Sequence, residues 1–237
     1  MSKRTSIAVL TAAALLMGVA TVSAKLPRLR YSPKAEMPGH EGVALSLAFS
    51  LDGKFLLSGG SDGRVYVYST DTQRALHRFD TQHRQVRDVA MAPGGAGFAT
   101  VGDDGQVRIW DLKKKTFVKT IRAHSDPILS VAYNVSGEHI ITGSADESAK
   151  IWDVESGLLK RELKGHDGPV LSALFAPSGL TVLSVSSDKT VRVWDPTSGR
   201  EKRALNESAA KHGKLLDLAL GPDGRITATV IQEVKRA

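Results

Sequence analysis

The chain has 237 residues, no cysteine and a formal net charge of +7. The lack of cysteine excludes disulfide bonds and a lipid-modified N-terminal cysteine. The positive charge is mild for this length. It is not accompanied by a basic patch with interleaved aromatic residues, so we expect no nucleic-acid partner.

Residues 1–24 have the three parts of an export signal. Lys3 and Arg4 form a basic start, residues 7–20 are apolar, and residues 22–24 form a small-residue cleavage site. The apolar run is shorter than the roughly 20 residues of a membrane span. We predict a bacterial protein that is periplasmic or secreted, with no stable membrane insertion after cleavage. An uncleaved N-terminal anchor is the alternative.

The rest of the chain repeats with a period of 42 residues, which tryptophans mark at Trp110, Trp152 and Trp194. Tyr68 stands one period earlier. Three other residue types keep this period, within one residue for the histidines: aspartates at Asp62, Asp104, Asp146 and Asp188, hydroxyls at Ser58, Thr100, Thr142 and Ser184, and histidines at His40, His83, His124 and His166.

Each unit has the pattern of four short strands. Each unit begins with an alternating apolar stretch, a glycine turn and a second apolar stretch. It continues with a turn on the aspartate, the stretch that ends at the tryptophan and a more polar stretch. The units are residues 39–80, 81–122, 123–164 and 165–206, with a partial fifth at 207–237. One small sheet cannot bury both its faces, so neighbouring units must stack.

These repeats resemble the WD40 β-propeller family, whose units run about 40–45 residues from glycine–histidine to tryptophan–aspartate. Glycine–histidine is intact at 39–40 and 165–166, but is replaced at 82–83 and 123–124, and the first repeat ends in Tyr68-Ser69. The resemblance implies an all-β, WD40-type β-propeller with four full repeats and a partial fifth, in which His212, Thr229 and Glu233 hold the repeated positions only approximately.

In this family a histidine, a hydroxyl, the turn aspartate and the tryptophan form a hydrogen-bonded tetrad within each blade. The resemblance places such tetrads at His40, Ser58, Asp62, Tyr68; His83, Thr100, Asp104, Trp110; His124, Thr142, Asp146, Trp152; and His166, Ser184, Asp188, Trp194. Three of these residue types could also form a nucleophilic triad. A catalytic site is needed once, whereas this set occurs four times, so we expect a structural role.

No metal or cofactor pattern emerges from the remaining residues. The stretch 144–152 is similar to the Asp-box of sialidase-like propellers, but its tryptophan lies one residue too far and its glycine is missing. The repeated acids stand singly rather than in the clusters that calcium prefers. His77 and His139 lack the partner spacing of a zinc site.

The resemblance implies that partners bind the face carrying the turn aspartates. The matching positions are Val43, Leu45, Gln85, Arg87, Asp103, Pro127, Leu129, Pro169 and Leu171. Large aliphatic residues beside an arginine suit a protein partner, although some of these leucines could instead pack between blades. We expect a non-catalytic protein–protein interaction scaffold of the bacterial cell envelope, without cofactor.

The alternative function is a periplasmic propeller enzyme, lactonase- or hydrolase-like, which would need unrepeated polar residues at the channel mouth. Asp88 is one, because it replaces the serine of Ser46, Ser130 and Ser172. Beside Arg87, we expect Asp88 to form an ion pair with it or to line the channel.

The partial fifth repeat leaves three forms of the ring open: a closed ring of five blades, an open arc, or part of a longer propeller. Residues 29–37 could supply a closing strand. We favour an open arc, whose free edge could allow self-association. The polar fourth stretches carry many cations that would protect the outer edge, and Lys113–Lys115 is the best candidate there for a groove that binds acidic partners.

Overall fold

The computed structural model describes residues 39–206, 213–220 and 226–232. They all belong to one of the two compact units of the chain, Ala35–Ala237. The predicted export signal, the N-terminal segment 25–38 with its candidate closing strand, and His212 and Glu233 of the fifth repeat lie outside the described residues.

Four antiparallel sheets of four strands follow the four predicted repeats. The first contains β1 (Ala44–Phe49), β2 (Phe55–Gly60), β3 (Arg64–Ser69) and β4 (Ala75–Asp80). The second contains β5 (Val86–Met91), β6 (Gly97–Gly102), β7 (Gln106–Asp111) and β8 (Thr116–Arg122). The third contains β9 (Ile128–Tyr133), β10 (His139–Ser144), β11 (Ala149–Asp153) and β12 (Leu159–Leu163). The fourth contains β13 (Val170–Phe175), β14 (Val182–Ser186), β15 (Thr190–Trp194) and β16 (Glu201–Asn206).

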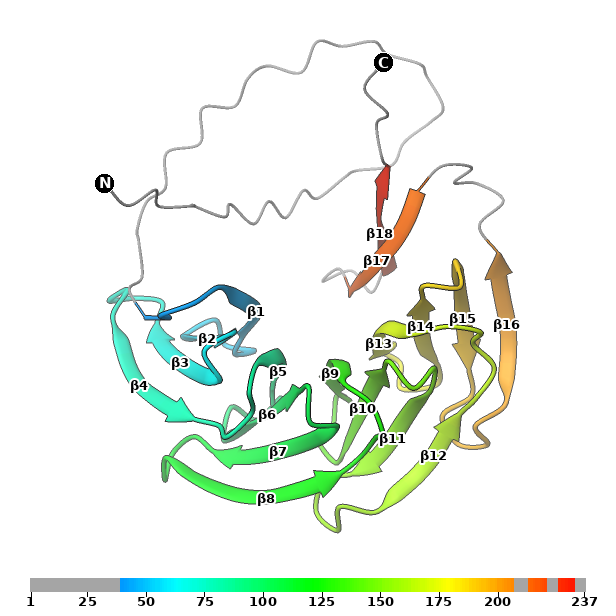
Figure 1. The fold of residues 1–237 in the computed structure, drawn as a ribbon. Helices are drawn as coiled ribbons and strands as arrows, with labels where there is room; N and C mark the ends of the chain where they lie inside the picture. Colours follow the sequence, from blue (N-terminus) through cyan, green and yellow to red (C-terminus); the bar gives the residue numbers. More distant parts are fainter. Residues whose placement is uncertain (1–38, 207–212, 221–225, 233–237) are drawn as a thin grey trace, which may run out of the picture. The chain divides into compact units, whose positions relative to one another are not determined.

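A fifth sheet has two described strands, β17 (Gly213–Leu220) and β18 (Ile226–Gln232). The first strand of each sheet contacts that of the next, from β1 through β5, β9 and β13 to β17, so these strands are innermost and the fourth strands are outermost (Figure 1). Among the described strands, β1 makes no comparable contact with β17 or β18. The all-β propeller is therefore confirmed, and its ring is not closed by the described residues.

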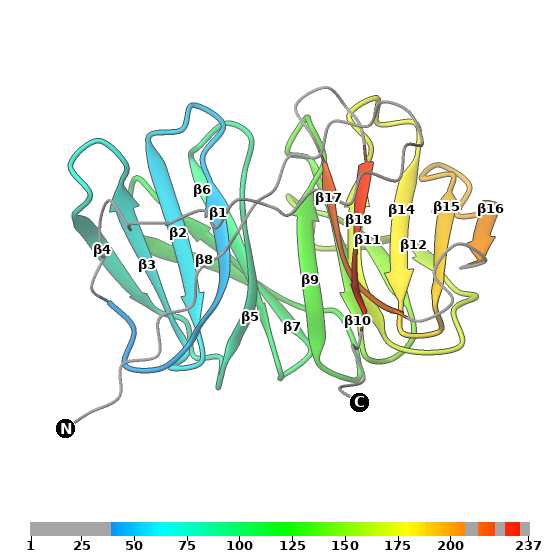
Figure 2. The ribbon, with the colours of Figure 1, turned by 90° about the horizontal axis from the view of Figure 1, so that it is seen from above.

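The hydrophobic core lies between the blades. Leu57 and Val67 of the first blade pack in one cluster with Val89, Phe98 and Trp110 of the second. Equivalent clusters join the second blade to the third and the third to the fourth. The strands of neighbouring sheets run alongside one another between two rows of turns (Figure 2). Stacking thus buries the sheet faces that a single blade would expose.

The turn after each repeated aspartate has a left-handed backbone. Gly63 adopts φ +74, and a Cβ atom there would lie 2.3 Å from the His83 carbonyl oxygen of the next blade. The third and fourth blades place Glu147 (φ 68) and Lys189 (φ 70) at this position. A side chain is uncommon in this conformation, so these two turns are held by their surroundings.

Candidate functional site

The third blade brings His124, Thr142, Asp146 and Trp152 into one hydrogen-bonded chain. Trp152 Nε1 donates to Thr142 Oγ1 at 3.0 Å, and this hydroxyl lies 2.7 Å from His124 Nε2. On the other side of the ring, His124 Nδ1 is 2.8 Å from Asp146 Oδ2. Because the hydroxyl accepts a hydrogen bond from the indole and donates one to the imidazole, every buried polar atom of these four side chains has a partner.

The fourth blade repeats this geometry. Trp194 Nε1 donates to Ser184 Oγ at 2.8 Å, that hydroxyl lies 2.7 Å from His166 Nε2, and His166 Nδ1 is 2.9 Å from Asp188 Oδ2. Burial opposes the ionised form of Asp188, but hydrogen bonds from Thr190 and His166 outweigh it and lower the pKa of this carboxyl to about 2. The aspartate is therefore the permanent negative end of the chain.

The second blade adds a cation to its tetrad. His83 lies 2.9 Å from Asp104 and 3.1 Å from the Thr100 hydroxyl, to which Trp110 also donates at 3.1 Å. Arg108 Nη1 donates to Asp104 Oδ2 at 2.7 Å beside the histidine ring. Burial, followed by the charge of Arg108, lowers the pKa of His83, so this imidazole stays neutral.

The first blade keeps three of the four groups and replaces the indole. His40 Nδ1 lies 2.9 Å from Asp62 Oδ1, and His40 Nε2 lies 2.8 Å from the Ser58 hydroxyl. Tyr68 occupies the tryptophan position, is buried and stacks on Tyr66 at 6.2 Å. A phenol there retains the aromatic packing of the repeat with a different polar group.

These histidines are not accessible for chemistry on a substrate. The side chains of His83, His124 and His166 are 0% exposed. Burial is also the main cause that lowers the pKa of His124 and of His166. A base in a reaction must reach the proton that it removes, so the geometry of these tetrads supports a structural role.

Two hydroxyls of the network had not been assigned from the sequence. Ser148 Oγ donates to Asp146 Oδ1 at 2.6 Å, and Thr190 Oγ1 donates to Asp188 Oδ1 at 2.7 Å. Each stands two residues after the turn aspartate, a position where Ser and Thr commonly bond to Asp in turns. The spacing of two residues from the aspartate could have predicted these two hydroxyls from the sequence.

The predicted partner positions lie at the end of the blades that carries the aspartate turns. Leu45, Arg87, Leu129 and Leu171 are each the second residue of an innermost strand, and the start of each such strand pairs with the end of the strand before the turn, as Ala44 does with Gly60. We call these four residues, with Val43, Gln85 and Asp103, the aspartate-turn face.

The aspartate-turn face is unevenly exposed. Val43 and Leu45 are 48% and 41% exposed, whereas Leu129, Leu171 and Gln85 are partly buried. Arg87 Nε donates to Asp103 Oδ1 at 2.6 Å, and the arginine side chain remains 41% exposed. The face therefore combines an accessible apolar edge on the first blade with a fixed, exposed guanidinium on the second.

The expected pair between Asp88 and Arg87 is not formed, because Arg87 binds Asp103 instead. Asp88 accepts a hydrogen bond from Ser46 Oγ at 2.5 Å and from the backbone N–H of Val131 at 2.9 Å. It thus connects the innermost strands of three blades. Adjacent side chains along a strand point to opposite faces of the sheet, which is why Arg87 and Asp88 do not meet.

Serines make the same kind of link elsewhere. Ser46 Oγ accepts from the Val89 N–H at 3.2 Å, and Ser130 Oγ from the Ala173 N–H at 3.1 Å. Burial raises the pKa of Asp88 to about 6, with a smaller contribution from the nearby carboxylate of Asp217. Asp88 is therefore a charged substitute at a structural position between blades.

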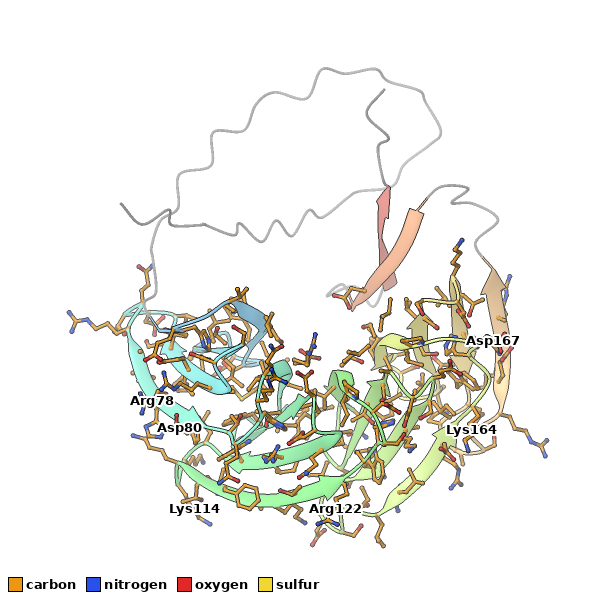
Figure 3. All side chains as sticks on the ribbon, in the orientation of Figure 1. Arg78, Asp80, Lys114, Arg122, Lys164 and Asp167 are labelled. Carbon is orange, nitrogen blue, oxygen red and sulfur yellow. The ribbon has the colours of Figure 1, made fainter. Side chains whose placement is uncertain are left out.

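The outer strands carry charges of both signs. Figure 3 shows Arg78, Lys114, Arg122 and Lys164 along the outer part of the blades. Several of the cations are paired: Arg78 with Asp80 at 3.4 Å, Lys114 with Asp111 at 3.7 Å, and Lys164 with Glu162 at 3.1 Å. Charges of this kind hinder pairing of the edge with another sheet.

Neither a metal centre nor a membrane span is found in the described part of the chain. No group of three or more His, Asp or Glu side chains there could hold a metal ion. No helix among those residues is long and apolar enough to cross a membrane.

Repeated four-stranded blades, stacked through their innermost strands and held by buried networks of histidine, hydroxyl and aspartate, define a β-propeller. A family profile described as the NUP159/214 beta propeller matches residues 21–212. The chain belongs to this β-propeller family. It is also similar to Protein ALTERED SEED GERMINATION 2 of Arabidopsis thaliana, with 35% identity over 54 residues, which is 23% of this chain and 7% of that protein.

Proposed function

We propose that this protein is a non-catalytic protein-interaction scaffold, a propeller of the WD40 type that binds a partner protein through its aspartate-turn face. A propeller domain fits such a role, because its stacked sheets form a rigid support whose loops and strand ends are free to bind. The three complete tetrads support the WD40 assignment, and the N-terminal pattern of residues 1–24 supports export to a bacterial cell envelope.

The observation that carries this proposal is the exposed group formed by Val43, Leu45 and Arg87. Val43 and Leu45 are accessible apolar side chains, and Arg87 is accessible yet held by Asp103. Arginine and large apolar side chains at the centre of an interface are the common sources of binding energy. A guanidinium that is already oriented loses little further freedom when a partner binds.

The proposal that the protein is not an enzyme is supported by the use of its reactive residue types. The repeated histidines are buried in the tetrads, and both carboxylate oxygens of Asp88 accept hydrogen bonds from neighbouring strands. The polar groups that a hydrolase would need are thus engaged in holding the blades together.

Partner capture by a double variant tests the interaction surface. Affinity-tagged Arg87→Ala/Leu129→Ala protein, expressed in its native host, should lose the proteins that co-purify with the unchanged chain, while its circular dichroism and melting temperature stay nearly the same. Truncating interface residues of this kind typically costs about 2 kcal/mol or more of binding free energy, a loss of at least about thirtyfold in affinity.

The matched control changes an arginine and a leucine of the outer edge, Arg122→Ala/Leu158→Ala, both exposed, and should retain capture. Unfolding of the aspartate-turn variant would assign Leu129 to the packing between blades. A folded aspartate-turn variant that still captures the same proteins would show that their contact lies elsewhere.

A further inference from the structure

A cavity of about 400 Å³ opens between the first two blades, at the end of the strands opposite the aspartate turns. Residues of β2, β3 and β4 line one side, and the β5–β6 and β7–β8 loops line the other. Its lining residues are Phe55, Val67, Leu76, His77, Gly95, Leu112, Lys113 and Lys115. We call it the blade 1–2 cavity.

The cavity combines an apolar interior with a basic rim. Phe55, Val67, Leu76 and Leu112 supply the apolar surface, and Lys113 and Lys115 stand exposed at its edge. The intervening Lys114 pairs with Asp111 at 3.7 Å, whereas neither Lys113 nor Lys115 forms a salt bridge with another described residue. Two lysines that pair with no described acidic residue therefore flank the apolar interior of the cavity.

The corresponding places between later blades are crossed by a long cationic side chain. Lys119 Nζ donates to the Glu155 carbonyl between the second and third blades. Arg161 Nε donates to the Thr197 carbonyl at 2.5 Å between the third and fourth. Each bond joins the fourth strand of one blade to the loop before the fourth strand of the next, and so crosses the cleft between the two blades.

His77 occupies this position in the first blade, one period of 42 residues before Lys119. The matching carbonyl belongs to Lys113, and no hydrogen bond joins the two among the described residues. The shorter imidazole instead packs edge-on against Phe79, with 4.6 Å between ring centroids. The blade 1–2 cavity is therefore the one of these three positions that no long cationic side chain crosses among the described residues. A smaller cavity of about 300 Å³ remains at the corresponding position between the third and fourth blades, beside Arg161 and Thr197.

We propose that the blade 1–2 cavity binds a segment of a partner protein in which large apolar side chains are flanked by aspartates or glutamates. The volume accommodates one or two such side chains, and their burial supplies the binding free energy. The lysines at the rim match the flanking carboxylates and orient the segment. Because this cavity lies at the opposite end of the strands, it is a second surface, independent of the aspartate-turn face.

A labelled peptide tests this site directly. The probe is a short fluorescein-labelled peptide with a central leucine–phenylalanine pair and glutamates on both sides, titrated with the full chain and followed by fluorescence anisotropy. We expect saturable binding that weakens as salt is added. A peptide with lysines in place of the glutamates should bind at least tenfold more weakly, as should one with alanines in place of the apolar pair.

Variants then locate the binding. His77→Arg should reach the Lys113 carbonyl as Arg161 reaches that of Thr197, narrow the cavity and weaken binding severalfold without lowering the melting temperature. Leu76→Glu, which alters a half-exposed lining residue, should also weaken it. Lys113→Gln/Lys115→Asn should weaken it severalfold and flatten its salt dependence, and asparagine tolerates the left-handed backbone of Lys115 (φ 58).

The matched controls are Lys114→Gln, which removes the paired lysine between the two, and the aspartate-turn variant Arg87→Ala/Leu129→Ala, and both should bind the probe normally. Failure of the native chain to bind would overturn the proposal. The proposal would also fail if the folded His77→Arg variant bound the probe as tightly as the native chain, or if the lysine-flanked peptide bound as tightly as the probe. Binding of laurate without binding of the peptide would overturn it as well, because the cavity would then be a site for a lipid anion.

Discussion

At the scale of single residues, the tetrads solve the problem of burying polar groups beside an aromatic core. Trp152 and Trp194 are nearly fully buried, and their indole N–H groups need acceptors that water cannot provide. The hydroxyls of Thr142 and Ser184 accept these bonds. Each hydroxyl is in turn hydrogen-bonded to a histidine, and each histidine to an aspartate nearer the surface. Removing any member leaves its neighbours buried without partners.

We therefore predict that Asp146→Ala and Trp152→Ala reduce stability. Asp146→Ala leaves buried donors without an acceptor and should lower the free energy of unfolding by about 1–3 kcal/mol. Trp152→Ala also creates a cavity and should lower it by about 3–5 kcal/mol. Thermal and urea melts measure both. Asp167→Ala is the control, because this exposed aspartate (Figure 3) belongs to no tetrad. Native-like melting of both tetrad variants would contradict the structural assignment.

At the scale of strands and blades, the innermost strands are held together by side chains that bond to the backbone of the next blade. Ser46 and Ser130 do this with a neutral hydroxyl, and Asp88 does it with a carboxylate. A carboxylate can accept from two neighbouring blades at once, as Asp88 does from Ser46 and Val131. The cost is that a charge is partly buried between the strands.

This cost predicts a pH dependence of stability. The pKa of Asp88 is about 6 in the folded protein and about 3.9 for an unfolded aspartate. Between these values the folded state binds more protons, so the free energy of unfolding decreases as the pH rises through this window and stays lower above it. Asp88→Ser, which restores the serine of the other blades, should raise this free energy by about 1–2 kcal/mol at pH 7.

Urea melts at a series of pH values check this prediction. The gain of Asp88→Ser over the native chain should shrink as the pH is lowered from 7 toward about 4, because the folded carboxyl becomes protonated and the unfolded one begins to be protonated as well. Asp126→Asn, at an exposed position, should follow the native pH profile. A variant that is less stable than the native chain at pH 7 would show that the carboxylate links the blades at no net cost.

At the scale of the whole molecule, the first blade differs from those that have a blade before them. Leu47 and Phe49 of β1 are 48% and 63% exposed, whereas the equivalent Val89 and Phe175 are 3% and 8% exposed. The preceding sheet covers the latter residues, and no preceding sheet among the described residues covers β1. Self-association through this face stays a prediction, for which an exposed apolar surface is the physical motive.

Export concerns the whole chain as well. If residues 1–24 are an export signal, mature protein from a bacterial host should begin at Lys25 and appear in the soluble envelope fraction. N-terminal sequencing after cell fractionation measures both. Mutating the small residue at the cleavage site, Ala24→Arg, should block processing and leave an uncleaved precursor, whereas a native product that starts at Met1 or Ser2 in the cytosol would contradict export.

The sequence by itself determined, through its 42-residue period, the repeated units of four strands that must stack. The family resemblance of the repeated motifs implied the β-propeller class and the residues of the tetrads. These features are local, because strand alternation, turn residues and the partners within one blade all repeat in every unit. Tertiary structure alone decided what happens between blades: Arg87 binds Asp103 rather than Asp88, and Asp88 joins three blades. It also decided that the lysines at 113 and 115 border a cavity that the shorter side chain of His77 does not cross. Such contacts depend on how far each side chain reaches between stacked sheets, and the repeat pattern does not encode that distance.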